Sequence, residues 1–194
     1  MIIAIAKDEA FDFVYKANID DLARLGEVVY FSPLNDGELP ACDLLYLPGG
    51  YPELYAVQLS ANTSMRSSIK AHIEGGGLTF AECGGFMYLC QSIDENEMCG
   101  VFNIKASMQN ARLHLGYRSF EMNGVKMCGH EFHYSDIVEC DLNNGINVLQ
   151  NQVSANGTPV TTTIYHYKHT LAGYTHWYWA ENGFDNTWLK LLEK

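Results

Sequence analysis

Short apolar runs alternate with amphipathic segments through the first half of the chain. The apolar runs are typical of buried strands and cover residues 2–6, 27–31, 44–47 and 78–81. Helical spacing of apolar residues starts at Phe13, ends at Gly26 and returns over residues 63–74. Strands that alternate with helices predict an α/β fold with a mostly parallel sheet and helices on both faces. Ligands of such sheets bind at the carboxyl ends of the strands.

The second half of the chain changes to β-branched and alternating runs. They cover residues 100–107, 117–122, 132–139, 148–153 and 159–165. Asn-Gly pairs at 123–124, 144–145 and 156–157 predict hairpins or tight turns. We therefore expect antiparallel strands in the C-terminal half, which extend the central sheet or cover one of its edges. An aromatic segment follows over 171–179, and a final helix is predicted from Phe184 to the end.

Composition narrows the class of protein. At 194 residues, 47% of them hydrophobic, the chain is long enough for one well-buried globular domain. It has 23 acidic and 12 basic residues, and this net charge of -11 argues against nucleic acid or an anionic membrane as the main partner. No apolar run reaches the length of a membrane span, and we find no secretory signal. The six cysteines form no Cys-x-x-Cys pair, so we expect a reducing cytoplasm.

Cys83 is the candidate nucleophile. It stands between the fourth apolar run and a segment of helical spacing, with Ala81 two residues before it and Gly84 and Gly85 directly after it. These small neighbours leave room for the sharp turn of a nucleophile elbow. A helix that begins at Gly84 would direct its free N–H groups and positive end at the sulfur, which favours thiolate and could hold an oxyanion. The alternative is a buried structural cysteine, which is the commoner role.

A cysteine nucleophile needs an imidazole that is near it in space rather than in sequence. The chain has seven histidines. Four of them are expected on the solvated surface or beside a strand end: His72, His114, His166 and His169. His176 follows the last predicted strand, which can return it to the Cys83 elbow, and we favour it as the base. A lone histidine among aromatic residues is more often packed in a core, and this alternative stays open.

Four ordered motifs resemble the glutaminase domain of cobyrinic acid a,c-diamide synthase. They are Asp8-Glu9-Ala10-Phe11, Leu47-Pro48-Gly49-Gly50-Tyr51-Pro52-Glu53, Ala81-Glu82-Cys83-Gly84-Gly85-Phe86-Met87-Tyr88-Leu89 and Gly129-His130-Glu131-Phe132-His133-Tyr134-Ser135. The resemblance covers nearly the whole chain, and the last motif is characteristic of this branch rather than of glutamine amidotransferases in general. It implies a single glutamine amidotransferase domain over residues 1–194, with the flavodoxin-like fold of the class I enzymes.

The resemblance also implies roles for individual residues. Cys83 matches the cysteine that attacks the side-chain amide of L-glutamine, forming a thioester and releasing ammonia. His176 matches the histidine that raises the nucleophilicity of this cysteine. Gly50 and Gly84 match the backbone donors that bind the tetrahedral oxyanion.

The base histidine departs from the class I pattern. In many class I amidotransferases a glutamate follows the base by two residues and orients it, whereas Tyr178 occupies that position here. We therefore expect a Cys-His dyad. Glu131 or His133 could supply the missing contact, but their alternation along a strand slightly favours a structural or interface role.

The synthetase part of the family is missing from the sequence. In the family that this chain resembles, full-length members carry an N-terminal ATP-binding domain, which is where ATP and Mg²⁺ are expected to bind. The chain contains no Gly-x-x-x-x-Gly-Lys-Ser/Thr motif, so we expect no cofactor or metal of its own and either an excised domain or a separate glutaminase subunit. The complete reaction implied is ATP- and glutamine-dependent amidation of the a and c carboxylates of cobyrinic acid, in cobalamin biosynthesis.

Three alternatives remain at this point. The chain could serve another synthetase, such as the one that amidates lipid II, or it could be a peptidase-like cysteine hydrolase on a similar fold. The third is a zinc-binding module formed by Cys128, His130, His133, His166 and His169. Their spacing on predicted strands sends side chains to opposite faces, which argues against such a module.

Overall fold

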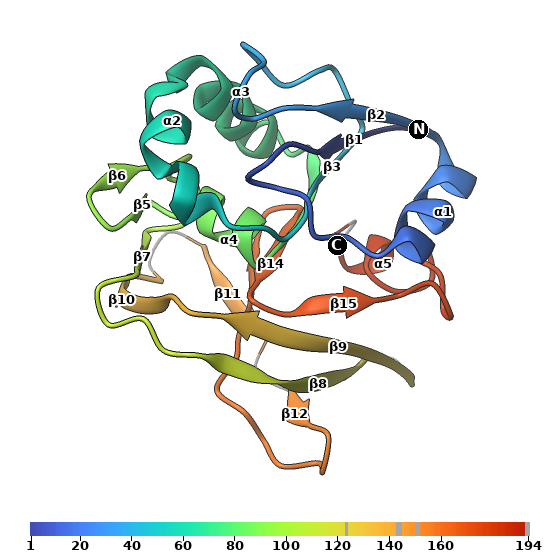
Figure 1. Ribbon diagram of the computed structural model, residues 1–194. Coiled ribbons are helices and arrows are strands. Elements are labelled where there is room, and N and C mark those ends of the chain that lie inside the picture. Colours follow the sequence, from blue (N-terminus) through green and yellow to red (C-terminus); the bar gives the residue numbers. More distant parts are fainter. Residues whose placement is uncertain (123, 143–144, 150–151, 193–194) are drawn as a thin grey trace.

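A seven-stranded sheet forms the centre of the molecule (Figure 1). The computed structural model describes residues 1–194 except 123, 143–144, 150–151 and 193–194. Its strands are, in spatial order, β11 (Asn147–Leu149), β13 (Ile164–Tyr167), β14 (Thr170–Gly173), β4 (Leu78–Glu82), β3 (Leu44–Leu47), β1 (Ile2–Ala6) and β2 (Glu27–Phe31). The strands from β14 to β2 are parallel, and β13 and β11 add an antiparallel edge. The expected α/β fold with a mostly parallel sheet is confirmed.

Helices cover both faces of this sheet (Figure 1). One face carries η1 (Pro52–Tyr55), α2 (Ala56–Ala61), α3 (Thr63–Glu74) and α4 (Gly84–Leu89), and the other carries α1 (Lys16–Leu25) and α5 (Leu189–Leu192). The helix α3 has the predicted bounds, because Asn62 caps its first turn and the buried Met65, Ile69 and Ile73 recur every four residues. Among the described residues, no helix is long and apolar enough to cross a membrane.

Two smaller sheets pack beside the central one. The first contains β10 (Asp136–Cys140), β7 (Ile104–Ser107), β5 (Ser92–Ile93) and β6 (Asn96–Glu97). The second contains β12 (Val153–Ser154), β8 (His114–Met122), β9 (Val125–His133) and β15 (His176–Tyr178). Strands β11 and β13 therefore extend the central sheet as expected, whereas the other antiparallel strands form sheets of their own.

Several sequence-based boundaries were wrong. The runs 100–107 and 159–165 form strands only from Ile104 and from Ile164 onward. The first helix begins at Lys16 rather than near Phe13, because the backbone of Phe13 pairs with Gly49 through an N–H···O bond of 3.1 Å. The run 132–139 is divided between β9 and β10 by a break after His133. The last helix is limited to Leu189–Leu192 within the described residues.

The Asn-Gly turns are described in part. Residues 154–158 form a tight turn in which Gly157 has a φ of +81°, as the Asn156-Gly157 pair predicts. Strands β8 and β9 pair antiparallel from His114 and His133 up to Met122 and Val125. Asn123 and Asn144 themselves lie outside the described residues.

Candidate active site

Cys83 occupies a nucleophile elbow. It lies between the end of β4 and the start of α4 with a φ of +46°, a conformation rarely adopted by residues other than glycine. Its N–H donates to the carbonyl of Gly173 over 2.8 Å, which fixes the turn to the neighbouring strand β14. The elbow needs small neighbours, because a Cβ atom on Gly85 would lie 2.1 Å from the carbonyl oxygen of Leu47. The small residues after Cys83 are therefore required by the packing of the turn.

Cys83 and His176 line the same cavity, which has a volume of about 290 Å³. Its other lining residues are Phe13, Gly50, Tyr51, His130 and Phe132. The cavity lies at the carboxyl end of the central sheet, where the α/β architecture predicts a ligand site. The structure thus brings together the candidate nucleophile, the candidate base and one candidate oxyanion donor.

His176 is held in the cavity by ring contacts. Its imidazole stacks on His130 with ring centroids 4.9 Å apart, and Phe13 packs edge-on against it at 4.6 Å. The residue is only 4% exposed, and burial lowers its pKa to about 3, with the nearby His130 and His133 adding to the effect. His176 is therefore neutral at physiological pH and can accept a proton.

Within the described residues, no side chain hydrogen-bonds to Nδ1 of this imidazole. The Nδ1 atom of His176 is buried and has no partner within the described part of the chain. Tyr178, at the position of the usual class I glutamate, is exposed and packs edge-on against Tyr15 instead. The ring depends on stacking and on the position of its own backbone.

The thiol of Cys83 is held in its neutral form. The residue is 4% exposed, and burial raises its pKa; the nearby Glu53 adds to this shift, whereas the N–H of Gly84 opposes it. The sulfur donates a hydrogen bond to the carbonyl oxygen of Phe132 over 3.7 Å. The expectation that the helix start favours thiolate is therefore wrong for the resting protein, because burial outweighs the six-residue helix α4.

Gly50 and Gly84 lie side by side at the elbow. A Cβ atom on Gly84 would be 3.0 Å from the backbone nitrogen of Gly50 and 2.8 Å from Cδ of Pro52. On Gly50, which has a φ of +155°, it would be 2.1 Å from the carbonyl oxygen of Ala10. The Gly84 N–H also contacts the Cys83 thiol, and Gly50 lines the same cavity as the sulfur, so both predicted oxyanion donors belong to residues near the candidate nucleophile.

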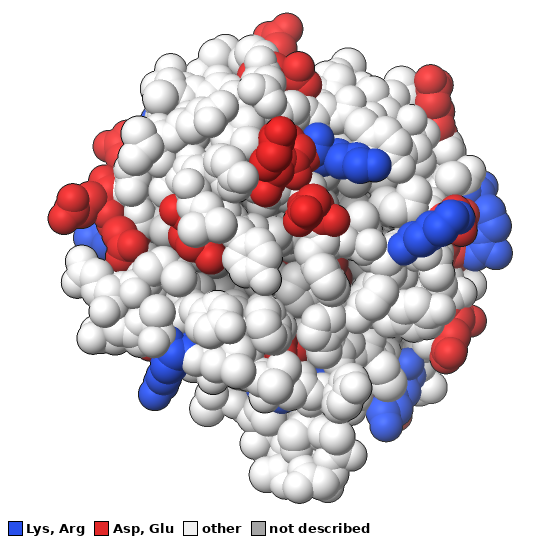
Figure 2. Space-filling view, viewed as in Figure 1, with Lys and Arg blue, Asp and Glu red and all other residues white. Residues whose placement is uncertain are grey.

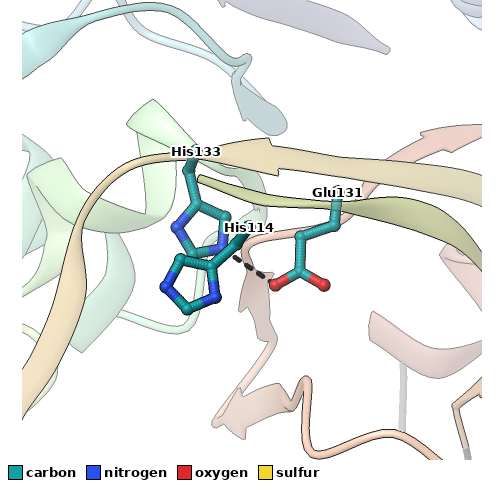
Figure 3. A group of neighbouring side chains, drawn as sticks. All are labelled: His114, Glu131 and His133. Carbon is teal, nitrogen blue, oxygen red and sulfur yellow. Dashed lines mark hydrogen bonds and ion pairs between the residues drawn. The ribbon is translucent and has the colours of Figure 1, made fainter. Parts of the chain in front are cut away.

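Glu131 and His133 belong to a separate polar network on β8 and β9 (Figure 3). The Glu131 carboxylate accepts from Nε2 of His133 over 2.8 Å, from Nε of Arg118 over 2.7 Å and from the Thr162 hydroxyl over 2.7 Å. Burial alone raises its pKa, but these hydrogen bonds and the Arg118 charge lower it to about 2. Nδ1 of His133 also lies 2.9 Å from the carbonyl oxygen of Ser135. The structure therefore engages both residues with each other and not with the unpartnered Nδ1 of His176.

Among the described residues, one group of possible metal ligands has its donor atoms within 4.8 Å of one another: His114, Glu131 and His133. The rings of His114 and His133 stack in parallel, 4.6 Å apart, rather than converging on a common point (Figure 3). Arg118 already neutralises the carboxylate. His114, expected on the solvated surface, is thus half-buried in this network. The zinc alternative requires Cys128, His130, His133, His166 and His169, and the described residues do not assemble them into one group of ligands.

Two residues that line the cavity, Phe13 and His130, and Tyr15 beside them were not among the candidates for the glutaminase site. Phe13 and Tyr15 precede α1, and His130 lies on β9, where Nδ1 hydrogen-bonds with the hydroxyl of Tyr15 over 2.8 Å. His130 stands directly before Glu131 in the fourth motif, so the motif contained the signal, although only Glu131 and His133 were considered as supports. Phe13 could not be recognised because its backbone pairs with Gly49, which is distant in sequence.

Comparison with known families decides the assignment. The model of the CobB/CobQ-like glutamine amidotransferase domain matches residues 2–184. The chain belongs to this family. The resemblance found in the four motifs is confirmed, together with its class I fold.

Curated relatives are substantially longer than this chain. The cobyrinate a,c-diamide synthase of Picrophilus torridus is 42% identical over 193 residues, which cover 93% of this chain and 41% of the relative. The synthase of the same name from Methanothermobacter thermautotrophicus is 48% identical over 145 residues, which cover 70% of this chain and 32% of the relative. The hydrogenobyrinate a,c-diamide synthase of Pseudomonas aeruginosa is 36% identical over 186 residues, which cover 93% of this chain and 42% of the relative. The chain thus spans less than half the length of these relatives.

Solved structures support the fold. A glutamine amidotransferase structure aligns with a TM-score of 0.61 at 16% identity and covers 99% of both chains. PurLQS from Thermotoga maritima aligns with a TM-score of 0.61 at 16% identity, covering 98% of this chain and 96% of the other. At this identity the likeness shows a shared fold.

Proposed function

We propose that the chain hydrolyses L-glutamine to glutamate and ammonia through a thioester on Cys83. The observation that carries the proposal is the single cavity that Cys83, His176 and Gly50 share, at an elbow beside the start of a helix. Membership in a glutamine amidotransferase family supplies the substrate class.

The residues of the cavity fit both halves of this reaction. Nδ1 or Nε2 of neutral His176 takes the thiol proton while the sulfur of Cys83 bonds to the carboxamide carbon of glutamine. The resulting oxyanion is bound by the N–H groups of Gly50 and Gly84. His176 then returns the proton to the amide nitrogen, the C–N bond breaks, and ammonia leaves a thioester. Water attacks the thioester with its proton passing to His176, and glutamate and the free thiol are regenerated.

The electrostatics of the resting site favour slow turnover by the chain alone. Burial raises the pKa of the Cys83 thiol and lowers that of His176 to about 3, so proton transfer from sulfur to nitrogen is unfavourable before substrate enters. The hydrogen bond from Cys83 to the Phe132 carbonyl further stabilises the thiol. We infer that the glutaminase is most active when a partner shifts β9 or closes the cavity.

We propose that this partner is an ATP- and Mg²⁺-dependent synthase part, which uses the ammonia to amidate the a and c carboxylates of cobyrinic acid in cobalamin biosynthesis. The names of the relatives and their greater length support this assignment. Leu113, Leu115 and Tyr117 alternate along β8 and its approach, and all three are exposed. Figure 2 shows few charged side chains over this part of the surface. An exposed apolar strip of this kind is typical of a contact surface.

The proposal is tested by measuring glutamate and ammonia released from L-glutamine, with L-asparagine as the matched control. We expect equal amounts of both products from glutamine and none from asparagine. Cys83→Ala should release neither while retaining the circular dichroism spectrum of the parent. Activity that persists in Cys83→Ala would overturn the proposal.

A further inference from the structure

The two proposed catalytic residues lie on different sheets. Cys83 follows β4 of the central sheet, whereas His176 begins β15, which pairs with β9 in one of the smaller sheets. Because Nδ1 of His176 has no partner within the described chain, the position of the imidazole depends on its ring contacts and on the backbone that carries it. A contact that fixes β15 to the end of β4 would therefore set the geometry of the pair.

The Glu82 side chain makes this contact. It is 2% exposed, and its Oε1 accepts a hydrogen bond from the backbone N–H of Trp177 over 2.7 Å. Its Oε2 accepts from the hydroxyl of Tyr46 on β3 over 2.7 Å. Glu82 directly precedes Cys83, and Trp177 directly follows His176. The hydrogen bond between Glu82 and Trp177 therefore connects the residue next to the nucleophile with the residue next to the base.

We propose that Glu82 is a positioning residue that fixes the base His176 relative to the nucleophile Cys83. This inference rests on the proposed glutaminase function. The Trp177 peptide is held from its other side as well, since its carbonyl accepts from Nδ2 of the fully buried Asn18 over 2.7 Å. Side chains alternate along β15, so anchoring Trp177 in the core directs His176 toward the cavity.

The contact tolerates a change in the protonation of Glu82. Burial raises the pKa of this carboxyl to about 8, with the bonds from Trp177 and Tyr46 opposing the shift. A protonated carboxyl keeps an oxygen that accepts from the Trp177 N–H, and it can donate to Tyr46 instead of accepting. Glutamine offers the same acceptor and donor, whereas leucine of similar size leaves the buried Trp177 N–H without a partner.

The test uses the full chain and the electrophilic glutamine analogue 6-diazo-5-oxo-L-norleucine, with both the limiting rate of Cys83 labelling and the half-saturating concentration measured. Glu82→Leu should lower the limiting rate about 10²-fold, as expected for a misplaced catalytic group, and leave the half-saturating concentration unchanged. Glu82→Gln should restore the rate to within a few fold of the parent. Tyr46→Phe removes only the other bond of Glu82 and should have a small effect.

Asp21 offers a matched control for general destabilisation. Its buried carboxylate accepts from the backbone N–H of Phe184 over 2.7 Å on the opposite side of the sheet from α4, and it does not line the cavity. Asp21→Leu should lower the melting temperature as Glu82→Leu does but keep the parental labelling rate. Equal slowing in both variants, or labelling of Glu82→Leu at the parental rate, would overturn the proposal.

Hydrogen exchange of the Trp177 amide measures the hydrogen bond to Glu82 independently of activity. We expect strong protection in the parent and in Glu82→Gln, and faster exchange in Glu82→Leu or, should that variant not fold, in Glu82→Asp, whose side chain is shorter by one methylene. An unprotected Trp177 amide in the parent would overturn the inference. A parent that is protected there but does not react with the analogue would instead count against the proposed function.

Discussion

The sulfur of Cys83 donates a hydrogen bond to the carbonyl oxygen of Phe132, 3.7 Å away on strand β9. The same strand pairs with β15 at His130 and His176, so one segment contacts both the nucleophile and the strand of the base. In the resting protein this arrangement stabilises a neutral thiol beside a neutral imidazole. Movement of β9 would therefore change the reactivity of Cys83 directly.

His176→Ala should lower glutamine hydrolysis by about 10² to 10⁴-fold, the range in which a positioned general base contributes. The ring lines the cavity with Cys83, whereas His133 is engaged by Glu131 and Ser135. His133→Ala is the comparison variant, and its steady-state rate should fall less. A larger loss in His133→Ala than in His176→Ala would contradict the assignment of the base.

Gly84→Ala should lower the hydrolysis rate by about 10²-fold, the effect of disturbing one oxyanion donor. The added methyl group would meet the Gly50 nitrogen at 3.0 Å and Pro52 at 2.8 Å, so the two proposed donors must separate. Gly37→Ala is the control, because nothing lies within 4 Å of a Cβ atom there. Parental rates in both variants would show that this loop does not bind the oxyanion.

Glu131→Ala should reduce the free energy of unfolding by about 3 to 5 kcal/mol, because it leaves Arg118 and His133 buried without their partner. Denaturant titration measures this change. Asp20→Ala breaks the exposed pair between Asp20 and Lys16, whose side chains are 61% and 85% exposed, and should cost less than about 1 kcal/mol. Similar losses in the two variants would contradict the structural role of the network.

Glu82 should make stability depend on pH in the neutral range. Burial raises its pKa from the ordinary value of 4.5 to about 8, so the folded protein retains a proton that the unfolded chain has lost. Its contribution to stability is complete below pH 4.5 and is lost as the pH rises toward 8, at about 1.4 kcal/mol per pH unit. Denaturant titrations at several pH values should show this slope in the parent relative to Glu82→Gln. Parallel stability curves would contradict the shift.

The elbow was predictable because it depends on residues that are adjacent in sequence. A buried strand followed by Cys83, Gly84 and Gly85 permits little other than a sharp turn, and the close approach of Gly85 to Leu47 shows why a larger residue would not fit. Helix α3 was predictable for the same local reason, since Asn62 and the buried spacing of Met65 and Ile69 determine it.

The rest of the site depends on contacts between distant segments. The stacking of His130 on His176 exists because β15 leaves the central sheet and pairs with β9, which no local pattern indicates. The protonation of Cys83 was expected from the helix start alone, whereas the tertiary fold buries the sulfur and raises its pKa. Phe13 was assigned to a helix because its pairing with Gly49 overrides the local spacing.

The most direct test of the account is to trap the nucleophile covalently with 6-diazo-5-oxo-L-norleucine and to map the adduct by digestion and mass spectrometry. The corresponding asparagine analogue is the control. The account predicts one glutamine-specific adduct, on Cys83, the elbow cysteine that shares its cavity with His176. Absence of any adduct, or indiscriminate labelling of all six cysteines, would contradict a formed glutaminase site.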